Sequence, residues 1–523
     1  MLLAPIDLVI IAAYLVAAAA IGLWFAKQTN TADDLFLAGR SLGFAVVGLS
    51  LFASNISSTT LIGVTGAAYS SGINVAHYEL MAAIILIVMT FLTIPVFLRC
   101  RLTTIPEYLE RRFGPLTCKY VSALTLMLSI LVDTAGSVYA GVLVLQTFAP
   151  SVPFVAACVV LACIAGIYTA AGGLRAVVYT DVLQTFVLLL GTTILAWNVW
   201  AAFDFDWAKA VASTDAEHLS LIRPLDNPHL PWLGVVIGLP VLGFYYWGTN
   251  QYVMQRVLGA KSLDHARWGA NLAALLKVLP LFLLALPAAF AFALLPPLEN
   301  PDLVFGEMIK TFVPVGLTGL ILAGLVAALM STIDSTLNSA STLVVRDFIG
   351  AHDKGWPEAD IVRLGRLITV GLMIVAALWP LVIREFPGLF SYIQQVFSYA
   401  VPPVAAVFLL GLLWRGTTEL GAIVTLVLGH TCGLLIMAWR AYAKASGAAD
   451  GLPHFTIVAG LTCIACLFIG VIVSTLSPRA VEVDELTLWQ PSDTETSERG
   501  WRDYRLQGAA TLFIVLICVL AFW

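Results

Sequence analysis

Charged residues are scarce in this sequence. Only 11% of the 523 residues are Asp, Glu, Lys or Arg, whereas 60% are hydrophobic, and the mean hydropathy is +0.93. This composition excludes an ordinary soluble enzyme and predicts a polytopic membrane protein. The sequence also has no basic tract, so nucleic acid is not an expected partner. The expected partner is the lipid bilayer.

Metal-binding and redox patterns are missing as well. The seven histidines form no HxH or HxxxH pair. The eight cysteines are scattered, and the spaced pair Cys463 and Cys466 lies in an apolar stretch that favours helix packing over metal binding. We therefore expect no organic cofactor and no structural metal. Residues 1–26 have no basic lead-in typical of a signal peptide, so they are expected to form a retained helix.

Long apolar runs predict about fourteen transmembrane helices. An even number puts both termini on one side of the membrane. Of the 27 Lys and Arg residues, 20 fall in the loops of one side and six in those of the other, and Lys277 lies inside a span. For a protein of the cell membrane, the positive-inside rule then places both termini outside the cytoplasm. The predicted spans are 5–26, 42–66, 75–98, 120–148, 152–170, 179–203, 231–254, 269–296, 313–343, 365–383, 388–413, 420–439, 454–476 and 507–523.

Two of these spans carry polar interruptions. The second has five hydroxyl side chains and one amide within residues 53–63, which predicts a helix broken in mid-membrane. The alternative is that Ser and Thr bond back to their own helix and only bend it. In the seventh span, Pro240, Gly243 and Gly248 bracket an aromatic run.

The interrupted spans are five apart, which indicates an inverted repeat of five plus five helices, spans 2–6 and 7–11, with extra helices at both ends. The predicted organisation is an N-terminal helix and cytoplasmic loop (1–41), a first repeat (42–204), an extracytoplasmic loop (205–230), a second repeat (231–413), and three C-terminal helices (414–523) with a polar cytoplasmic loop at 477–506.

Ionisable residues at membrane depth are the first functional candidates, because burying them is costly. They are Glu79, Asp133, Asp181, Lys277 and Asp334. A wet cavity and a structural ion pair between helices both remain open as explanations, the second especially for Asp181.

A polar face in the ninth span is the next candidate. Ser331, Asp334, Ser335, Asn338 and Ser339 lie within three or four residues of one another and so share one side of a helix. Their oxygens suit a hard cation, and set against the broken second span they predict a sodium site. A serine-rich helix–helix seam is the alternative.

Several motifs resemble the sodium:solute symporter family, in particular its sodium/sugar cotransporter branch. The resemblance covers spans 2 to 11. The motifs are DLFLAGRS (34–41), ASNIS (53–57), TIPEYL (104–109), RFG (112–114), GGL (172–174), YTDVLQT (179–185), YYW (245–247), NQ (250–251), QR (255–256), AK (260–261), NSAST (338–342) and the stretch 402–410.

The resemblance implies an all-α, LeuT-like fold and sodium-driven import of a sugar or polyol by alternating access, with a monomer sufficient for transport. It implies the following roles. Sodium is held by the carbonyls of Ala53, Ile56 and Ala328 and by the hydroxyls of Ser331 and Thr332; the solute is bound by Asn55, Glu79, Lys277 and Gln394, with Tyr246 as the inner gate below it; and Asp181 serves coupling.

This sequence also departs from the family pattern. Thr60 stands where sugar transporters carry Gln or His, and Asp133 replaces a neutral or basic residue, so both are included as substrate-binding candidates. Ala82 and Gly243 replace a Ser and an amide. Asp334 occupies a position that is a Thr linked to a second cation in some relatives. These changes leave open which solute is bound and how many sodium ions are moved.

Two other interpretations remain. The first keeps the fold and changes the solute to a sialic acid, a carboxylate or an amino acid; it would call for an Arg in the core spans, where none is expected. The second is a sodium or sugar sensor that transports nothing. An enzyme is not expected, because the sequence shows no nucleophile–base pair and its extramembrane segments are short.

Overall fold

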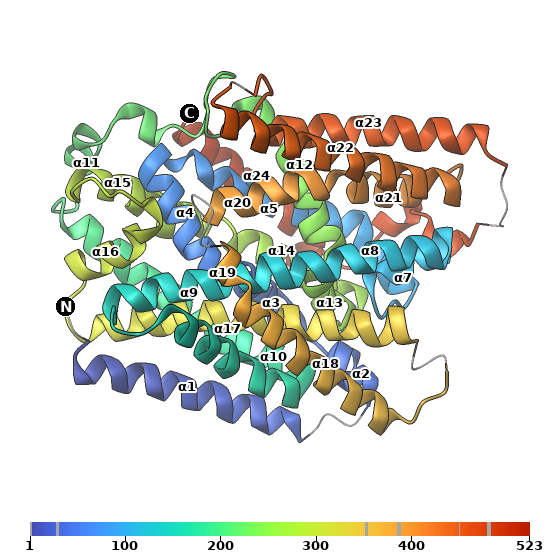
Figure 1. Ribbon diagram of the computed structural model, residues 1–523, viewed down its shortest axis with the longest axis horizontal. Helices are drawn as coiled ribbons and strands as arrows, with labels where there is room; N and C mark the ends of the chain where they lie inside the picture. Colours follow the sequence, from blue (N-terminus) through green and yellow to red (C-terminus); the bar gives the residue numbers. More distant parts are fainter. Residues whose placement is uncertain (1–2, 28–30, 351–353, 384–388, 449, 479–482) are drawn as a thin grey trace.

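The fold is a bundle of long helices that run side by side (Figure 1). The computed structural model describes residues 3–27, 31–350, 354–383, 389–448, 450–478 and 483–523. Within these residues the only strand-like pairing is an isolated bridge between Leu42 and Ala260. The prediction of an all-α membrane protein is confirmed.

The α-helices are α1 (Pro5–Ala26), α2 (Ala32–Leu37), α3 (Phe44–Asn55), α4 (Ser58–Ser71), α5 (His77–Phe91), α6 (Thr93–Arg99), α7 (Ile105–Phe113), α8 (Pro115–Leu128), α9 (Ala135–Phe148), α10 (Phe154–Ala201), α11 (Trp207–Ser213), α12 (Leu239–Phe244), α13 (Gln251–Leu258), α14 (Leu263–Leu276), α15 (Leu286–Leu294), α16 (Val304–Phe312), α17 (Leu317–Leu343), α18 (Glu358–Leu378), α19 (Pro380–Ile383), α20 (Leu389–Ala400), α21 (Pro402–Leu413), α22 (Glu419–Ser446), α23 (Phe455–Leu476) and α24 (Tyr504–Ala521).

Membrane-spanning helices occupy the predicted positions. In the described chain, 10 helices are long and apolar enough to cross a membrane, and two further helix pairs, α3–α4 and α20–α21, qualify as bent spans. The remaining two of the fourteen predicted spans correspond to shorter apolar helices, Phe154–Cys163 and Gly234–Thr249. Both chain ends lie at the end of the bundle that also carries α11 and α16, as an even number of crossings requires (Figure 1).

The predicted break in the second span is present. Helix α3 ends at Asn55, α4 begins at Ser58, and the two are bent by 56°. Ser57 forms the N-cap of α4, and its hydroxyl accepts a hydrogen bond from the Thr60 amide. The hydroxyl cluster therefore breaks the helix and caps a new one, and does not merely bend a continuous helix.

The seventh span is interrupted as well. It runs through a π-helix, η6 (Tyr245–Thr249), and stops at Asn250, where the backbone is extended (ψ 129°). The Asn250 side chain caps α13 by accepting a hydrogen bond from the Tyr252 amide over 3.1 Å. The glycines of this span permit a close approach: a Cβ on Gly243 would lie 2.9 Å from Ile85, and one on Gly248 would lie 2.5 Å from the Met89 sulfur. The missing side chains let the aromatic run pack against α5.

The polar loop at 477–506 is not a free loop. Arg99 donates to the Leu488 carbonyl over 2.7 Å, the Trp489 amide donates to Leu412 over 2.9 Å, and the Tyr108 hydroxyl donates to Thr487 over 3.1 Å. The part of this loop at 483–503 therefore lies against α6, α7 and α21.

Helices α3 and α14 make one of the closest contacts in the bundle, and small residues allow it. A Cβ on Gly48 would lie 2.8 Å from the Gly269 carbonyl oxygen, which cannot move away as a flexible side chain could. We expect Gly48→Ala to destabilise the protein by about 1–3 kcal/mol, measured by unfolding in detergent micelles. Gly371→Ala is the matched control, because a Cβ at Gly371 meets nothing within 4 Å. Equal stability of the two variants would contradict the packing argument.

Candidate substrate and cation site

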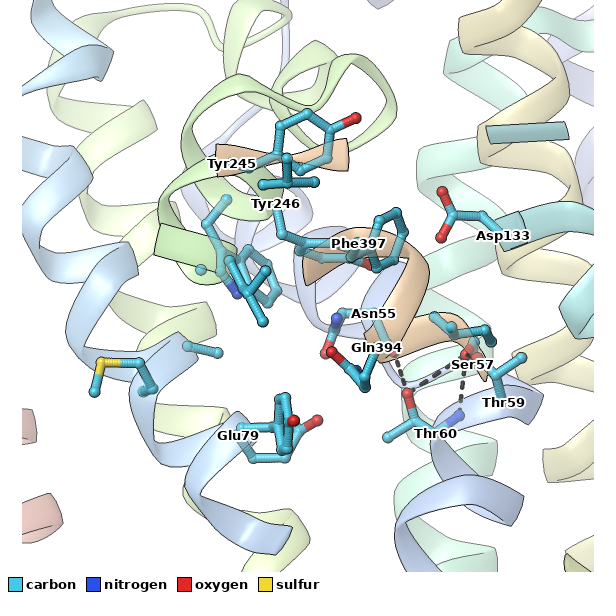
Figure 2. Close-up of a pocket in the computed structure, with 18 of the residues that line it drawn as sticks. Asn55, Ser57, Thr59, Thr60, Glu79, Asp133, Tyr245, Tyr246, Gln394 and Phe397 are labelled. Atoms are coloured by element: carbon cyan, nitrogen blue, oxygen red, sulfur yellow. Dashed lines mark hydrogen bonds between the residues drawn. The ribbon is translucent and has the colours of Figure 1, made fainter. Parts of the chain in front are cut away.

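A cavity of about 120 Å³ lies where the two interrupted spans meet. Helices α5, α17 and α20 and the π-helix η3 (Ser129–Thr134) complete its wall. Figure 2 shows the polar groups of the broken span and the aromatic rings facing the same space. The lining residues are Ser54, Asn55, Ser57, Thr59, Thr60, Tyr78, Glu79, Met81, Ala82, Asp133, Leu239, Leu242, Gly243, Tyr245, Tyr246, Trp247, Tyr252, Thr332, Ile393, Gln394, Phe397 and Val401.

The structure brings most of the predicted substrate-binding residues to this one cavity. Asn55, Thr60, Glu79, Asp133, Tyr246 and Gln394 all line it. Lys277 does not line it. Thr60 is engaged in the helix break itself, where its hydroxyl donates to the Asn55 carbonyl over 2.7 Å.

Glu79 and Lys277 form a buried ion pair in the cavity wall. The Lys277 ammonium lies 2.5 Å from one Glu79 oxygen and is fully buried. It also lies 5.3 Å from the ring centre of Trp247 and 5.8 Å from that of Phe52. The opposite charge of Glu79 and two aromatic faces offset the cost of burying Lys277. Lys277 is therefore linked to the cavity by its ion pair with Glu79. The second carboxylate oxygen of Glu79 remains for a ligand.

Aromatic rings form the opposite wall. Tyr246 packs edge-on against Trp247, with ring centres 5.1 Å apart, and against Tyr252, at 5.8 Å. The Tyr252 hydroxyl donates to the Tyr246 hydroxyl over 2.5 Å. Flat apolar rings with a few polar groups between them suit a small polar solute that has carbon–hydrogen faces.

The break between α3 and α4 frees two backbone carbonyls. In a continuous helix, Ser57 N–H would donate to Ala53 and Thr60 N–H to Ile56. Here the Ser57 amide donates to the Asn55 carbonyl over 2.8 Å, and the Thr60 amide donates to the Ser57 hydroxyl over 3.2 Å. The carbonyls of Ala53 and Ile56 are thereby released from the helix ladder, as the sodium-site prediction requires.

Helix α17 packs against both halves of the broken span and carries the other predicted sodium ligands. Ala328, Ser331 and Thr332 are all buried there. The Thr332 hydroxyl donates to the Ala328 carbonyl over 3.2 Å, and the Ser331 hydroxyl donates to an Asp181 oxygen over 2.6 Å. Carbonyl and hydroxyl oxygens from two elements therefore share one buried interface, which is the donor chemistry of a hard cation.

Asp181 and Arg256 form a second buried ion pair. Both side chains are fully buried, and an Arg256 nitrogen lies 3.0 Å from an Asp181 oxygen. Ser50 and Ser331 donate to the same carboxylate over 2.5 and 2.6 Å, and Arg256 also donates to Ser50 over 2.6 Å and to Ser335. Asp181 is thus part of a buried ion pair between helices, and the pair touches a predicted sodium ligand.

Arg256 is the main residue that sequence reasoning misplaced. Its place after the seventh apolar run led us to assign it to a cytoplasmic loop, but it is buried in the core. The signal that could have revealed it is its place on α13, one turn after Tyr252, whose carbonyl it contacts. The cavity residues Tyr252, Ile393 and Phe397 were also not predicted.

Asp334 is fully buried on α17 but is not among the residues that line the cavity. Its neighbours on the predicted polar face have other partners: Ser335 contacts Arg256, and the Asn338 amide donates to Gln255 over 3.4 Å. A direct link between Asp334 and the predicted sodium ligands remains a prediction.

Broken spans that meet at a central cavity, with freed carbonyls beside it, are the arrangement of the LeuT-like fold. Solved structures agree. A Na⁺-coupled sialic acid symporter in a substrate-bound, outward-open state matches with a TM-score of 0.80 at 24% identity, covering 92% of this chain and 100% of that one. Mhp1, a nucleobase-cation-symport-1 family transporter, matches with a TM-score of 0.57 at 14% identity, covering 86% and 96%.

Sequence comparison gives the family. The model of the sodium:solute symporter family matches residues 35–429. The chain is 36% identical to the sodium/myo-inositol cotransporter 2 of Rattus norvegicus over 473 residues, 82% of this chain and 70% of that one. It is 34% identical to the sodium/glucose cotransporter 1 of Oryctolagus cuniculus, also over 473 residues, 82% and 71% of the two chains. The chain belongs to the sodium:solute symporter family.

The Asp181–Arg256 pair gives a prediction about stability. Removing one partner of a buried pair leaves an uncompensated charge, so Asp181→Asn and Arg256→Gln should each cost about 3–5 kcal/mol. The double variant should recover part of that loss, because no lone charge remains. A double-mutant cycle on unfolding in detergent micelles measures the coupling.

The control is the exposed pair Arg415 and Glu485, whose atoms lie 2.8 Å apart but whose side chains are 63% and 54% exposed. The corresponding substitutions there should change stability by at most about 1 kcal/mol. Purely additive effects at Asp181 and Arg256 would show that the two charges do not support each other.

Proposed function

We propose that this protein is a sodium-coupled symporter that imports a sugar or polyol by alternating access. The observation that carries the proposal is the cavity wall in which Glu79, already neutralised by Lys277, stands with Asn55 and Gln394 opposite a face of aromatic rings. Amide and carboxylate groups exchange hydrogen bonds with hydroxyls, and the rings cover carbon–hydrogen faces. The names of the relatives, cotransporters of sodium with myo-inositol or glucose, support the same solute class.

Sodium is the proposed coupling ion. Its ligands would be the carbonyls of Ala53, Ile56 and Ala328 and the hydroxyls of Ser331 and Thr332. Asp181 would act as the coupling residue, because it accepts from Ser331 and is paired with Arg256. Asp334 is the proposed ligand of a second cation.

A sialic acid or other carboxylate is the alternative solute, and the cavity argues against it. No Lys or Arg is among the residues that line the described cavity, whereas Glu79 and Asp133 are. An anionic solute would meet like charge there without a partner. A solute without negative charge fits better.

The proposed setting is a cell membrane with both termini outside the cytoplasm. The bias of Lys and Arg toward one set of loops supports this orientation. A monomer is proposed to be sufficient for transport, and an oligomer is compatible with this proposal.

Loss of a sodium ligand should weaken sodium dependence. We expect Ser331→Ala to raise the sodium concentration for half-maximal uptake into proteoliposomes about tenfold. Ser341→Ala is the matched control, because this serine of α17 donates to the Gly365 carbonyl, away from the site. An unchanged sodium dependence in Ser331→Ala would remove that residue from the site.

The solute contacts can be tested with Gln394. Gln394→Ala should weaken binding of a neutral sugar or polyol roughly five- to 150-fold, because it leaves a solute hydroxyl without its partner. Sodium binding in the absence of solute should survive. Tryptophan fluorescence titrations in detergent measure both.

Deoxy analogues of the solute provide the control. An analogue without the hydroxyl that meets Gln394 should lose affinity for the unmodified protein but little further affinity for Gln394→Ala. A damaged fold would weaken all analogues alike. If the full sugar and polyol panel binds Gln394→Ala as it binds the unmodified protein, the sugar-site assignment fails.

A further inference from the structure

Asp133 is a cavity residue whose charge the proposed solute class leaves unexplained. It lies in η3, a π-helical turn between α8 and α9. The Thr134 hydroxyl supports this turn by donating to the Ser129 carbonyl over 2.7 Å, and it contacts Thr336 of α17 at 2.6 Å. A π-helical insertion rotates the residues around it, and such turns occur mostly at functional sites. In Figure 2 the Asp133 carboxylate faces the cavity beside Phe397.

The two carboxylates of the cavity differ in their partners. Glu79 has the Lys277 ammonium at 2.5 Å. Among the residues that the structure describes, the buried Oδ2 atom of Asp133 has no hydrogen-bond partner, and no Lys or Arg lines the cavity. A carboxylate in a cavity of low dielectric constant is costly to keep without a counter-charge. The cavity wall therefore supplies no counter-charge for an ionised Asp133.

Aromatic rings line the same cavity as Asp133. The rings of Tyr245 and Phe397 are 6.3 Å apart between centres, and both residues line the cavity with Asp133. Tyr246 lines it as well and packs against Trp247 and Tyr252. The face of an aromatic ring attracts a cation, and aromatic walls are the usual recognition element for ammonium ligands. A carboxylate among such rings is complementary to a small organic cation.

We propose that the cavity has an ammonium subsite at Asp133, so that its preferred solute is a polyol that carries a protonated amine. The inference rests on the proposed function and narrows its substrate class. Glu79, Asn55 and Gln394 take the hydroxyl groups, while Asp133 takes the ammonium group and the rings of Tyr245 and Phe397 flank it. A hydroxyl could satisfy one lone pair of Asp133 but would leave the charge uncompensated.

Ligand pairs of matched shape test this subsite. The probes are an inositol and its amino-deoxy analogue, compared at neutral pH, where the alkyl amine is protonated. Their dissociation constants are measured with the full-length protein in detergent at saturating sodium. The ratio of the two constants defines the amine preference. We expect the amino analogue to bind at least about tenfold more tightly than its neutral parent.

Asp133→Asn keeps the side-chain shape and removes the charge, so the amine preference should fall at least about tenfold. Glu79→Gln is the matched control, because it removes the charge of the other cavity carboxylate, the one that already has a partner. It should weaken both ligands and keep their ratio. Since only ratios are compared, a partial loss of folded protein does not change the result.

The outcomes separate this inference from the proposed function. If the neutral inositol binds as tightly as its amino analogue to the unmodified protein, the ammonium subsite is wrong while polyol transport stands. The subsite is also wrong if Asp133→Asn keeps the preference, or if it changes only the number of sodium ions moved per solute, which would make Asp133 a cation ligand. If neither ligand of any tested pair binds, the sugar or polyol function itself fails.

Discussion

The break between Asn55 and Ser58 is the constraint on which the rest of the site depends. Backbone polar groups in a bilayer must find partners inside the protein. Here the Ser57 hydroxyl and the Asn55 carbonyl take the hydrogen bonds that a continuous helix would have given to Ile56 and Ala53. The local sequence thus satisfies its own amides while it releases two carbonyls. A binding site can form at this depth because the side chains that break the helix also stabilise the broken ends.

The two buried ion pairs of this core have different roles. Lys277 and Glu79 place a neutral pair in the cavity wall, where the carboxylate keeps a free face for a solute. Asp181 and Arg256 lie deeper and tie together α3, α10, α13 and α17 through Ser50, Tyr252 and Ser331. Buried pairs add little net stability but strongly penalise any arrangement that separates them. We infer that the second pair holds the predicted sodium ligands in register.

The sequence predicted those features whose physics is local. A dense hydroxyl cluster in an apolar run predicted the break near Asn55, and the proline and glycines of the seventh span predicted its interruption. The family resemblance supplied Tyr246 and Gln394, which do line the cavity. Features that depend on how helices rotate against each other were missed. The charge of Arg256 suggested a loop, because its partner Asp181 lies about 75 positions earlier in the chain and the pairing cannot be read from local sequence. Lys277 faces Glu79 from outside the cavity, and the π-helical turn at Asp133 left no mark in the composition.

Sodium and solute sites that share walls have a direct route for coupling. Ser54 lines the cavity and its hydroxyl lies 3.4 Å from Asp181; Tyr252 lines the cavity and its carbonyl accepts from Arg256. Thr332 lines the cavity next to Ser331 in the predicted sodium site. Whatever fixes the geometry of one site therefore fixes part of the other. By thermodynamic linkage, a solute that binds better when sodium is present must strengthen sodium binding by the same factor. Coupling of this kind would require no distant signal, because Thr332 belongs to both predicted sites and Ser54 and Tyr252 join the cavity to the Asp181–Arg256 pair.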